Sequence, residues 1–564
     1  MIALVIASLL APAQPTKPPE DPLAPITEPH EEDTTPTPPP TAVVTVPKDW
    51  PGVFAAIRSS QWAAAQAGIA ALAPSPLTPL AKAQLYTAKG SPPVTAEQVT
   101  ALLAQAPELP QAEQLQRLAV AKGALQTPAV PRRAALVPIG ATPRRGRTSP
   151  VVGDAVADQL RVALEPLVKV DDAAGAEALL NAQSALLTPE ARAELGQRVA
   201  WIYYVRGDDM NARRVADFAR QGTSGPWGVQ AEWVDGLASW RQNDCEGAAR
   251  AFREVGQRSG EASLSAAGYY WSARAEMACR RPAAVQALLK AAARSQETFY
   301  GLLARKTLAM DTTLDPLDLA PAARIAALPN IVRAEALVKL GERDMAGELL
   351  RHQARIGAPA DQPALAAEAR KLELAATQHF LAHFGQPGAR VPAAARYPAP
   401  SWAPREGWTI DPALALAHSL QESSFRAEAV SQAGAVGLMQ VLPTTRDLIS
   451  RSRGLPTGNL KDVGVNLSFG QAWIQWMRSH PATGGQLPKV IASYNAGPLP
   501  VGRWQVNDRG DPLLWIESMP YWETRYYVPA VMRNLWVYQG FAGTPTTTLT
   551  ELAQHRWPTF PVRR

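Results

Sequence analysis

Cysteine is the rarest residue of this sequence, because the 564 residues include only Cys245 and Cys279. A metal site built on thiolates needs more ligands than these two, and neither belongs to a C-x-x-C pair. We therefore expect neither a metal site nor a cofactor. Cys245 begins one expected helix and Cys279 ends the next, antiparallel helix, so the two can form a disulfide in an oxidising compartment. Two buried free thiols are the alternative, since unpaired cysteine often packs as a small apolar residue.

The sequence also lacks strand-like alternation of apolar and polar residues between about residues 49 and 386. This stretch is rich in alanine and leucine, which predicts an all-helical structure. Hydrophobic residues make up 46% of the chain and charged residues 19%, an ordinary balance for a globular protein. A chain of 564 residues is too long for a single hydrophobic core, so we expect two or three structural units.

A hydrophobic run long enough to cross a bilayer is missing as well. The apolar run at residues 1–14 is too short for a mature membrane helix. Its Ala11-Pro12-Ala13 sequence has the A-x-A form of a cleavage site, so residues 1–13 are expected to be a signal peptide, although no basic residue precedes the run. No cysteine follows for a lipid anchor. Residues 14–48 are rich in proline and threonine and are expected to form a disordered tether.

A helix-pair repeat is visible within the helical region. Residues 206–212 (RGDDMNA) recur loosely at 241–247 (RQNDCEG), and again around 280–284 and 340–346. The first two segments are 35 residues apart, close to the period of about 34 residues in tetratricopeptide arrays. Such pairs stack into a curved solenoid. We expect this helical superhelix to span residues 49–395.

Three motifs follow in the last third of the chain, at residues 420–425 (LQESSF), 431–440 (SQAGAVGLMQ) and 493–498 (SYNAGP). A fourth stretch, 517–528 (ESMPYWETRYYV), comes after them. In this order they resemble the active site of the soluble lytic transglycosylases, which cleave peptidoglycan glycan strands. The resemblance implies a lysozyme-like catalytic domain over residues 396–564, and hence an all-α protein in which a solenoid precedes this domain. It extends back through the helical region to about Leu180.

Glu422 is the candidate catalytic residue. Asp411 and Pro412 form a helix start, and apolar residues at i, i+3, i+4 and i+7 from Ala413 mark one buried face. Glu422 lies off this face and near the helix C-terminus, where the helix dipole and apolar surroundings both raise the pKa of a carboxyl group. A raised pKa suits a general acid. A solvated charge at a helix end is the alternative.

The resemblance also implies a mechanism with a single acid. Glu422 would protonate the glycosidic oxygen while the N-acetyl group of the muramic acid stabilises the cationic sugar. The same residue would then take the proton of the C6 hydroxyl, giving a 1,6-anhydromuramic end without water. Glycosidases usually need a second carboxylate, and no acidic residue between positions 423 and 490 lies in a nucleophile-like motif. A hydrolytic muramidase and a non-catalytic peptidoglycan-binding scaffold are the alternatives.

The resemblance implies that substrate is bound by Ser431, Gln440, Tyr494, Asn495, Glu523 and Tyr526. The segment 434–440 lacks the Lys-Ser/Thr ending of a phosphate-binding loop, so its glycines are expected to let the backbone approach a sugar. Gln440 offers both a donor and an acceptor to sugar groups. A tight turn between two helices is the alternative for this segment.

Tyr494 and Asn495 resemble the family's aromatic-amide pair, which implies a place beside the acid. A tyrosine hydroxyl within reach of Glu422 would orient its proton, and Asn495 would hold the acetamido group of the substrate. Ordinary core packing is the alternative for Tyr494.

The last motif leaves two points open. Glu523 either faces the saccharide-binding groove that the resemblance implies, or it pairs with Arg525 or Arg533. The region is also rich in tryptophan, and we expect most of these rings in the core and one or two on the substrate. They are Trp473, Trp476, Trp504, Trp515, Trp522 and Trp536.

The net charge of +6 favours an acidic polymer as partner, and peptidoglycan strands qualify. Nucleic acid is not expected, because the basic residues are scattered and no nucleic-acid motif is present. We expect a periplasmic protein without a transmembrane anchor in its mature form, and a cell-wall enzyme complex is a further partner to consider.

Overall fold

The computed structural model describes residues 45–318 and 320–561. It divides into two compact units, residues 1–130 and 131–564. The expected signal peptide, residues 1–13, and residues 14–44 of the expected tether lie outside the described residues. Within the described ranges, we find no helix that combines the length and apolar character needed to cross a membrane.

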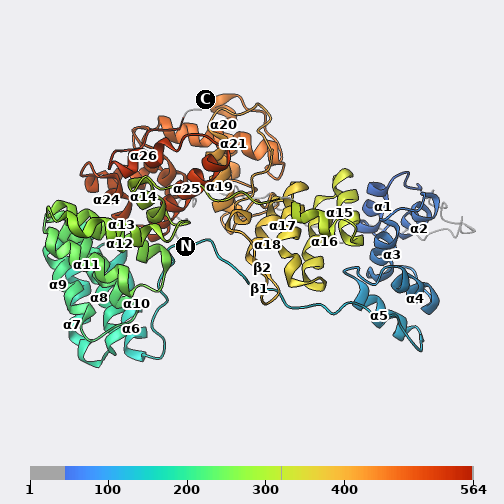
Figure 1. Cartoon of the computed structure of the whole chain (residues 1–564), viewed down its shortest axis with the longest axis horizontal. Helices are drawn as coiled ribbons and strands as arrows, with labels where there is room; N and C mark the ends of the chain where they lie inside the picture. Colours follow the sequence, from blue (N-terminus) through green and yellow to red (C-terminus); the bar gives the residue numbers. More distant parts are fainter. Residues whose placement is uncertain (1–44, 319, 562–564) are drawn as a thin grey trace, which may run out of the picture. The chain divides into compact units, whose positions relative to one another are not determined.

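The first unit is a small helical array with its own core, which includes Phe54, Leu80, Leu103 and Leu115. Its fourth helix begins with a capping box at Thr95. The helices, coloured blue in Figure 1, are α1 (Trp50–Arg58), α2 (Trp62–Ala71), α3 (Thr78–Thr87), α4 (Ala96–Gln105) and α5 (Ala112–Ala121).

The second unit begins, after residues 131–153, with pairs of helices. The recurring acidic residues of the sequence repeat are helix N-caps: Asp208 and Asp244 each accept a backbone N–H three residues ahead, at 3.1 Å and 2.9 Å. Each cap begins a helix that packs on the helix before it (Figure 1). The elements are α6 (Ala155–Lys169), α7 (Ala173–Gln183), η1 (Ser184–Leu186), α8 (Pro189–Arg206), α9 (Asp209–Arg220), α10 (Pro226–Arg241), α11 (Cys245–Arg258), α12 (Ala262–Ala278), η2 (Pro282–Ala284), α13 (Val285–Ala293) and α14 (Phe299–Thr307).

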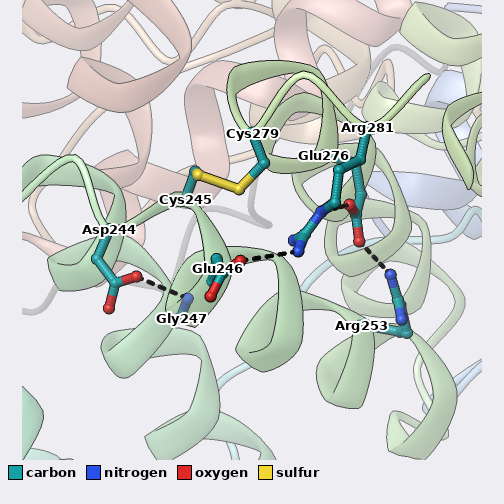
Figure 2. Close-up of a disulfide and its surroundings, with 8 residues drawn as sticks. All are labelled: Asp244, Cys245, Glu246, Gly247, Arg253, Glu276, Cys279 and Arg281. Carbon is teal, nitrogen blue, oxygen red and sulfur yellow. Dashed lines mark hydrogen bonds and ion pairs between the residues drawn. A yellow bond between two sulfur atoms is a disulfide. The ribbon is translucent and has the colours of Figure 1, made fainter.

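A disulfide joins the first residue of α11, Cys245, to Cys279 at the end of α12, with 5.5 Å between their Cα atoms (Figure 2). The carboxylate of Glu276 lies beside it and accepts hydrogen bonds from Arg253 and from Arg281, the latter at 2.7 Å. The disulfide therefore links the N-terminus of α11 to the C-terminus of α12.

Further helices follow in the same unit, and a two-stranded antiparallel pair joins this part to an earlier segment: β1 (Val137–Pro138) pairs with β2 (Phe384–Gly385). The remaining elements of this part are η3 (Ala320–Ile325), α15 (Pro329–Lys339), α16 (Arg343–Ile356), η4 (Pro359–Asp361), α17 (Gln362–Lys371), α18 (Ala375–His383) and η5 (Ala393–Arg396).

Residues 131–153, which we call the strap, are irregular apart from β1, as the proline- and arginine-rich sequence predicts. The strap contacts three parts of the second unit in turn. Its Ile139 N–H donates to the carbonyl oxygen of His383 (2.9 Å). The carbonyl oxygen of Pro143 accepts from Arg533 (2.5 Å), and that of Ser149 accepts from the Trp227 indole (2.9 Å). The strap thus connects α18, the C-terminal helices and α10.

Among the C-terminal helices, α25 packs on both α19 and α22, and Figure 1 shows α25 beside α19. Val528, Met532 and Leu535 of α25 are fully buried. The elements are α19 (Pro412–Ser423), α20 (Pro443–Arg453), α21 (Val463–Ser479), α22 (Leu487–Ala496), α23 (Pro498–Arg503), η6 (Trp504–Asn507), α24 (Pro512–Glu517), α25 (Trp522–Phe541) and α26 (Thr547–Ala553).

The C-terminal helices share a buried polar cluster with the preceding array. The carboxylate of Glu517 is fully buried and accepts hydrogen bonds from Arg145 of the strap (2.6 Å) and Tyr300 of α14 (2.7 Å). The rings of Phe299 and Trp536 stack nearby, with centroids 5.1 Å apart. Both partners of Glu517 therefore lie outside the C-terminal helices, and the strap supplies the cation that compensates this buried charge.

Candidate active site

The helix that carries Glu422 begins and ends as the sequence predicts. The side chain of Asp411 accepts the backbone N–H of Ala413 at 2.9 Å and caps α19. The helix stops because Ser424 and Phe425 adopt left-handed backbone conformations, with φ of 53° and 64°. Glu422 therefore lies in the last turn of α19, at the negative end of the helix dipole.

The carboxyl group of Glu422 is partly open to solvent and otherwise surrounded by protein. The Tyr527 hydroxyl of α25 donates a hydrogen bond to its Oε1 at 2.5 Å. Burial raises the pKa of Glu422 to about 7. The Tyr527 hydrogen bond acts in the opposite direction, and the negative charge of Glu523 raises the pKa further. Near neutral pH this group can therefore hold a proton and also release it.

Tyr527, not Tyr494, is the tyrosine that donates a hydrogen bond to the acid. The hydroxyl of Tyr494 donates to the backbone carbonyl of Met439 at 2.6 Å, and its ring packs on His418 with centroids 4.5 Å apart. Our sequence analysis overlooked Tyr527, although it lies within the last motif. The signal was its i, i+4 spacing from Glu523, which puts the two side chains on one face of a helix.

Residues 431–440 form a turn that its own side chains hold together. Ser431 Oγ accepts the N–H of Ala435 (3.0 Å), and Gln440 Nε2 donates to the carbonyl of Gly437 (2.9 Å). Gly437 has a φ of 79°, and a Cβ there would lie 2.3 Å from Asn466 Nδ2. The glycine is thus required by backbone conformation and by close approach. A substrate contact by Ser431 or Gln440 stays a prediction.

Asn466 was not singled out from the sequence, yet it fixes this turn to α21. Its Nδ2 donates to the carbonyls of Val436 (2.8 Å) and Leu460 (2.7 Å), and its Oδ1 accepts the N–H of Met439 (2.8 Å). A fully satisfied buried amide of this kind holds a loop in one conformation. No local sequence pattern marks it, because its partners lie on two other segments.

Asn495 lies at the end of α22, next to the start of α25. Its Oδ1 accepts a hydrogen bond from the Thr524 hydroxyl at 2.6 Å, which fixes the orientation of the amide. The side chain is half-buried, and within the described part of the chain its Nδ2 has no hydrogen-bond partner. A donor of this kind can meet a carbonyl group of a ligand.

Glu523 is exposed in the first turn of α25. Among the described residues it forms an ion pair with neither Arg525 nor Arg533, the two partners considered from the sequence. Arg525 lies over the ring of Trp201, 3.8 Å from its centroid, and Arg533 binds the strap. The negative charge of Glu523 raises the pKa of Glu422, so the two carboxyl groups interact electrostatically.

The ring of Tyr526 lies beneath the guanidinium of Arg145, at 5.0 Å, in the buried cluster around Glu517. The structure thus puts Tyr526 against the strap, whereas Glu523 interacts electrostatically with Glu422 and Asn495 binds Thr524, the neighbour of Glu523. Of the six tryptophans, Trp504, Trp515 and Trp536 are buried, Trp473 and Trp476 are half-buried, and Trp522 is exposed. Across residues 45–318 and 320–561, no group of three acidic, histidine or cysteine side chains is placed to hold a metal ion.

Comparison with known proteins identifies the class. Residues 402–512 match the family model of the transglycosylase SLT domain. The soluble lytic murein transglycosylase of Escherichia coli (strain K12) is 32% identical over 150 residues, which cover 26% of this chain and 23% of that protein. The endo-type membrane-bound lytic murein transglycosylase A of Klebsiella pneumoniae (strain 342) is 32% identical over 148 residues, which cover 23% of this chain and 73% of that protein.

Two solved structures share the fold. The 70 kDa soluble lytic transglycosylase of Escherichia coli has a TM-score of 0.56 and 18% identity, over 90% of this chain and 98% of that one. An inactive mutant of the lytic transglycosylase Slt from Pseudomonas aeruginosa has a TM-score of 0.55 and 20% identity, over 88% and 86%. The molecule is therefore an all-α superhelix with a lysozyme-like domain, which confirms the predicted fold class.

The chain belongs to the soluble lytic transglycosylase family. The sequence match spans about a quarter of the length of the soluble relative from Escherichia coli, so the similarity in sequence is concentrated in the helices around Glu422.

Proposed function

We propose that this protein is a peptidoglycan lytic transglycosylase, which cleaves the bond between N-acetylmuramic acid and N-acetylglucosamine and leaves 1,6-anhydromuramic ends. The observation that carries the proposal is the position of Glu422: a partly buried carboxyl group with a pKa raised to about 7, hydrogen-bonded to Tyr527 at the end of α19. The names of the relatives agree with it, since they are lytic murein transglycosylases.

In the first step, the protonated Glu422 donates its proton to the glycosidic oxygen, and the bond to the muramic acid breaks. Because the pKa of the acid is close to the working pH, a substantial fraction of the protein holds the proton in this step. The Nδ2 group of Asn495 has no hydrogen-bond partner among the described residues, and it is the candidate to hold the acetamido carbonyl of the substrate.

In the second step, the Glu422 carboxylate accepts the proton of the C6 hydroxyl while that oxygen attacks C1. The Tyr527 hydrogen bond stabilises this carboxylate between the two steps. One residue thus serves as acid and then as base, and the proton balance closes without water. The inactive Pseudomonas aeruginosa protein carries glutamine in place of a glutamate, which agrees with one essential carboxyl group.

We also propose the chain organisation expected from the sequence: a signal peptide at 1–13, a tether at 14–48, a superhelix at 49–395 and a catalytic domain at 396–564. The proposed signal peptide and the proposed peptidoglycan substrate together favour the periplasm as its location. Ser431, Gln440, Tyr494, Glu523 and Tyr526 remain proposed contacts of the glycan strand, and a cell-wall enzyme complex remains a proposed partner.

Hydrolysis is the second candidate, and one observation favours it. Glu523 is exposed and close enough to Glu422 to raise its pKa, so it supplies a second carboxylate that could activate a water molecule. A non-catalytic scaffold would not require a carboxyl group with a raised pKa at the end of α19.

Digestion of purified peptidoglycan sacculi tests the proposal. We expect the parent protein to release muropeptides whose muramic ends are one water lighter than reducing ends by mass spectrometry. We expect Glu422→Gln to release them at a rate lower by about 10²–10⁴-fold or more, with its circular dichroism spectrum unchanged. Release at the parent rate by Glu422→Gln would contradict the assignment.

A further inference from the structure

His418 lies four residues before Glu422 on α19, so the two side chains project from the same face of the helix. The His418 side chain is fully buried. Its Nδ1 lies 2.9 Å from the Tyr527 hydroxyl oxygen, the same group that donates to Glu422. Three side chains from two helices therefore form a continuous hydrogen-bonded chain that ends at the acid.

Among the described residues, the imidazole of His418 has one hydrogen-bond partner, Tyr527, and is otherwise in packing contacts. The rings of Tyr494 and Tyr527 pack against it, with centroids at 4.5 Å and 6.0 Å. Its Nε2 is buried and has no hydrogen-bond partner among the described residues. A buried polar atom without a partner is unfavourable, and an apolar side chain would fill the same space without this cost. The bond to Tyr527 is therefore the interaction that the imidazole adds to packing.

Burial also fixes the charge of this ring. It lowers the pKa of His418 to about 3, so the imidazole is neutral over the working range of pH. A neutral imidazole has one donor and one acceptor nitrogen. The Tyr527 hydroxyl donates its hydrogen to the Glu422 carboxylate, so its oxygen can only accept from His418. Nδ1 must therefore carry the hydrogen of the imidazole, and Nε2 is the acceptor without a partner. The unpartnered Nε2 agrees with this tautomer.

We propose that His418 is a positioning residue for the acid: through its Nδ1–H it holds the Tyr527 hydroxyl in the orientation that aligns and stabilises Glu422. The inference rests on the proposed function, because it assigns a role within that reaction. A tyrosine hydroxyl is free to rotate about its C–O bond, and a second hydrogen bond removes this freedom. Without His418, the hydroxyl would populate orientations that do not meet the carboxylate.

A matched pair of amide substitutions isolates the hydrogen bond. In His418→Asn the amide nitrogen takes the place of Nδ1 and can still donate to Tyr527. In His418→Gln the longer side chain moves the amide to the place of Nε2, where the bond is lost. We expect His418→Gln to lower kcat on a soluble glycan strand by about 10-fold or more with KM changed less than about twofold, and His418→Asn to retain most of kcat. Equal kcat values for the two variants, or a lower value for Asn, would overturn the proposal.

The Tyr527→Phe background separates positioning from packing. If His418 acts through the tyrosine hydroxyl, His418→Gln should have no further effect on kcat once that hydroxyl is absent. A loss as large as in the parent protein would show that His418 acts structurally, and would overturn the inference. Inactivity of the parent protein itself would instead refute the proposed function, so the two failures are distinguishable.

Discussion

The hydroxyl of Tyr527 donates a hydrogen bond to Oε1 of Glu422 across 105 residues of sequence and from one packed helix to another. This contact links the electrostatics of the carboxyl group that we propose as catalytic to α25. The donor also stabilises the charged form of the acid and so lowers the pKa of Glu422, on which the pH dependence of the proposed reaction rests.

Tyr527→Phe should move the alkaline limb of activity to higher pH. The first step needs protonated Glu422, so the rate should fall as pH rises through the pKa of about 7. The hydroxyl lowers this pKa, and its removal therefore raises it, while the misaligned acid lowers the maximal rate. Initial rates on a soluble glycan between about pH 5 and about pH 9 measure both effects. A limb that moves to lower pH would contradict this account.

Glu523→Gln should move the same limb in the opposite direction. The negative charge of Glu523 raises the pKa of Glu422, so its removal lowers that pKa. Glu523 is exposed, and the displacement should therefore shrink as salt is added. Glu428→Gln is the matched control, because Glu428 is an exposed carboxylate that pairs with Lys461 at 2.8 Å. If Glu523→Gln and Glu428→Gln give the same pH profile, the two carboxyl groups do not share a site.

Arg145→Met should destabilise the second unit. It removes the cation from the fully buried Glu517 and leaves Tyr300 as its remaining partner. Leaving a buried charge uncompensated costs about 3–5 kcal/mol in the free energy of unfolding. Chemical denaturation followed by circular dichroism measures this, with Arg144→Met at the exposed neighbouring position as control.

Adding Glu517→Gln to Arg145→Met should recover part of that loss, because the charge itself is then gone. An Arg145→Met protein as stable as the parent would show that the strap does not neutralise Glu517.

Cys245→Ser combined with Cys279→Ser should lower the free energy of unfolding by about 3–4 kcal/mol in the chain-entropy model, since the cysteines are 34 residues apart. Protein isolated from the envelope should also resist alkylation under denaturing, non-reducing conditions. Two alkylated thiols would show that the cysteines are free there.

The sequence was sufficient for the features that local chemistry determines. The start of α19 follows from Asp411 and Pro412, and the place of Glu422 in its last turn follows from the helical period. The recurring Asp208 and Asp244 mark the starts of helices because an N-cap side chain binds a backbone N–H only three residues ahead, which makes the pattern local.

The contacts that complete the site were beyond local patterns. Arg145 and Glu517 are 372 residues apart, and their pairing depends on the path of an irregular strap without any periodicity. Tyr494 and Tyr527 both lie in motifs, and only the packing of α22 and α25 around α19 decides which hydroxyl meets the acid. Side-chain partners between distant segments follow from tertiary structure and not from propensity.

The most direct test of the central claim, that Glu422 moves one proton out and another back without water, is cleavage of a defined glycan strand in water enriched in heavy oxygen. We expect muramic ends that are one water lighter than reducing ends and carry no heavy oxygen, because the C6 oxygen of the sugar closes the ring. Muramic ends that incorporate heavy oxygen at C1 during cleavage would show that water is the nucleophile, and would replace this account with hydrolysis.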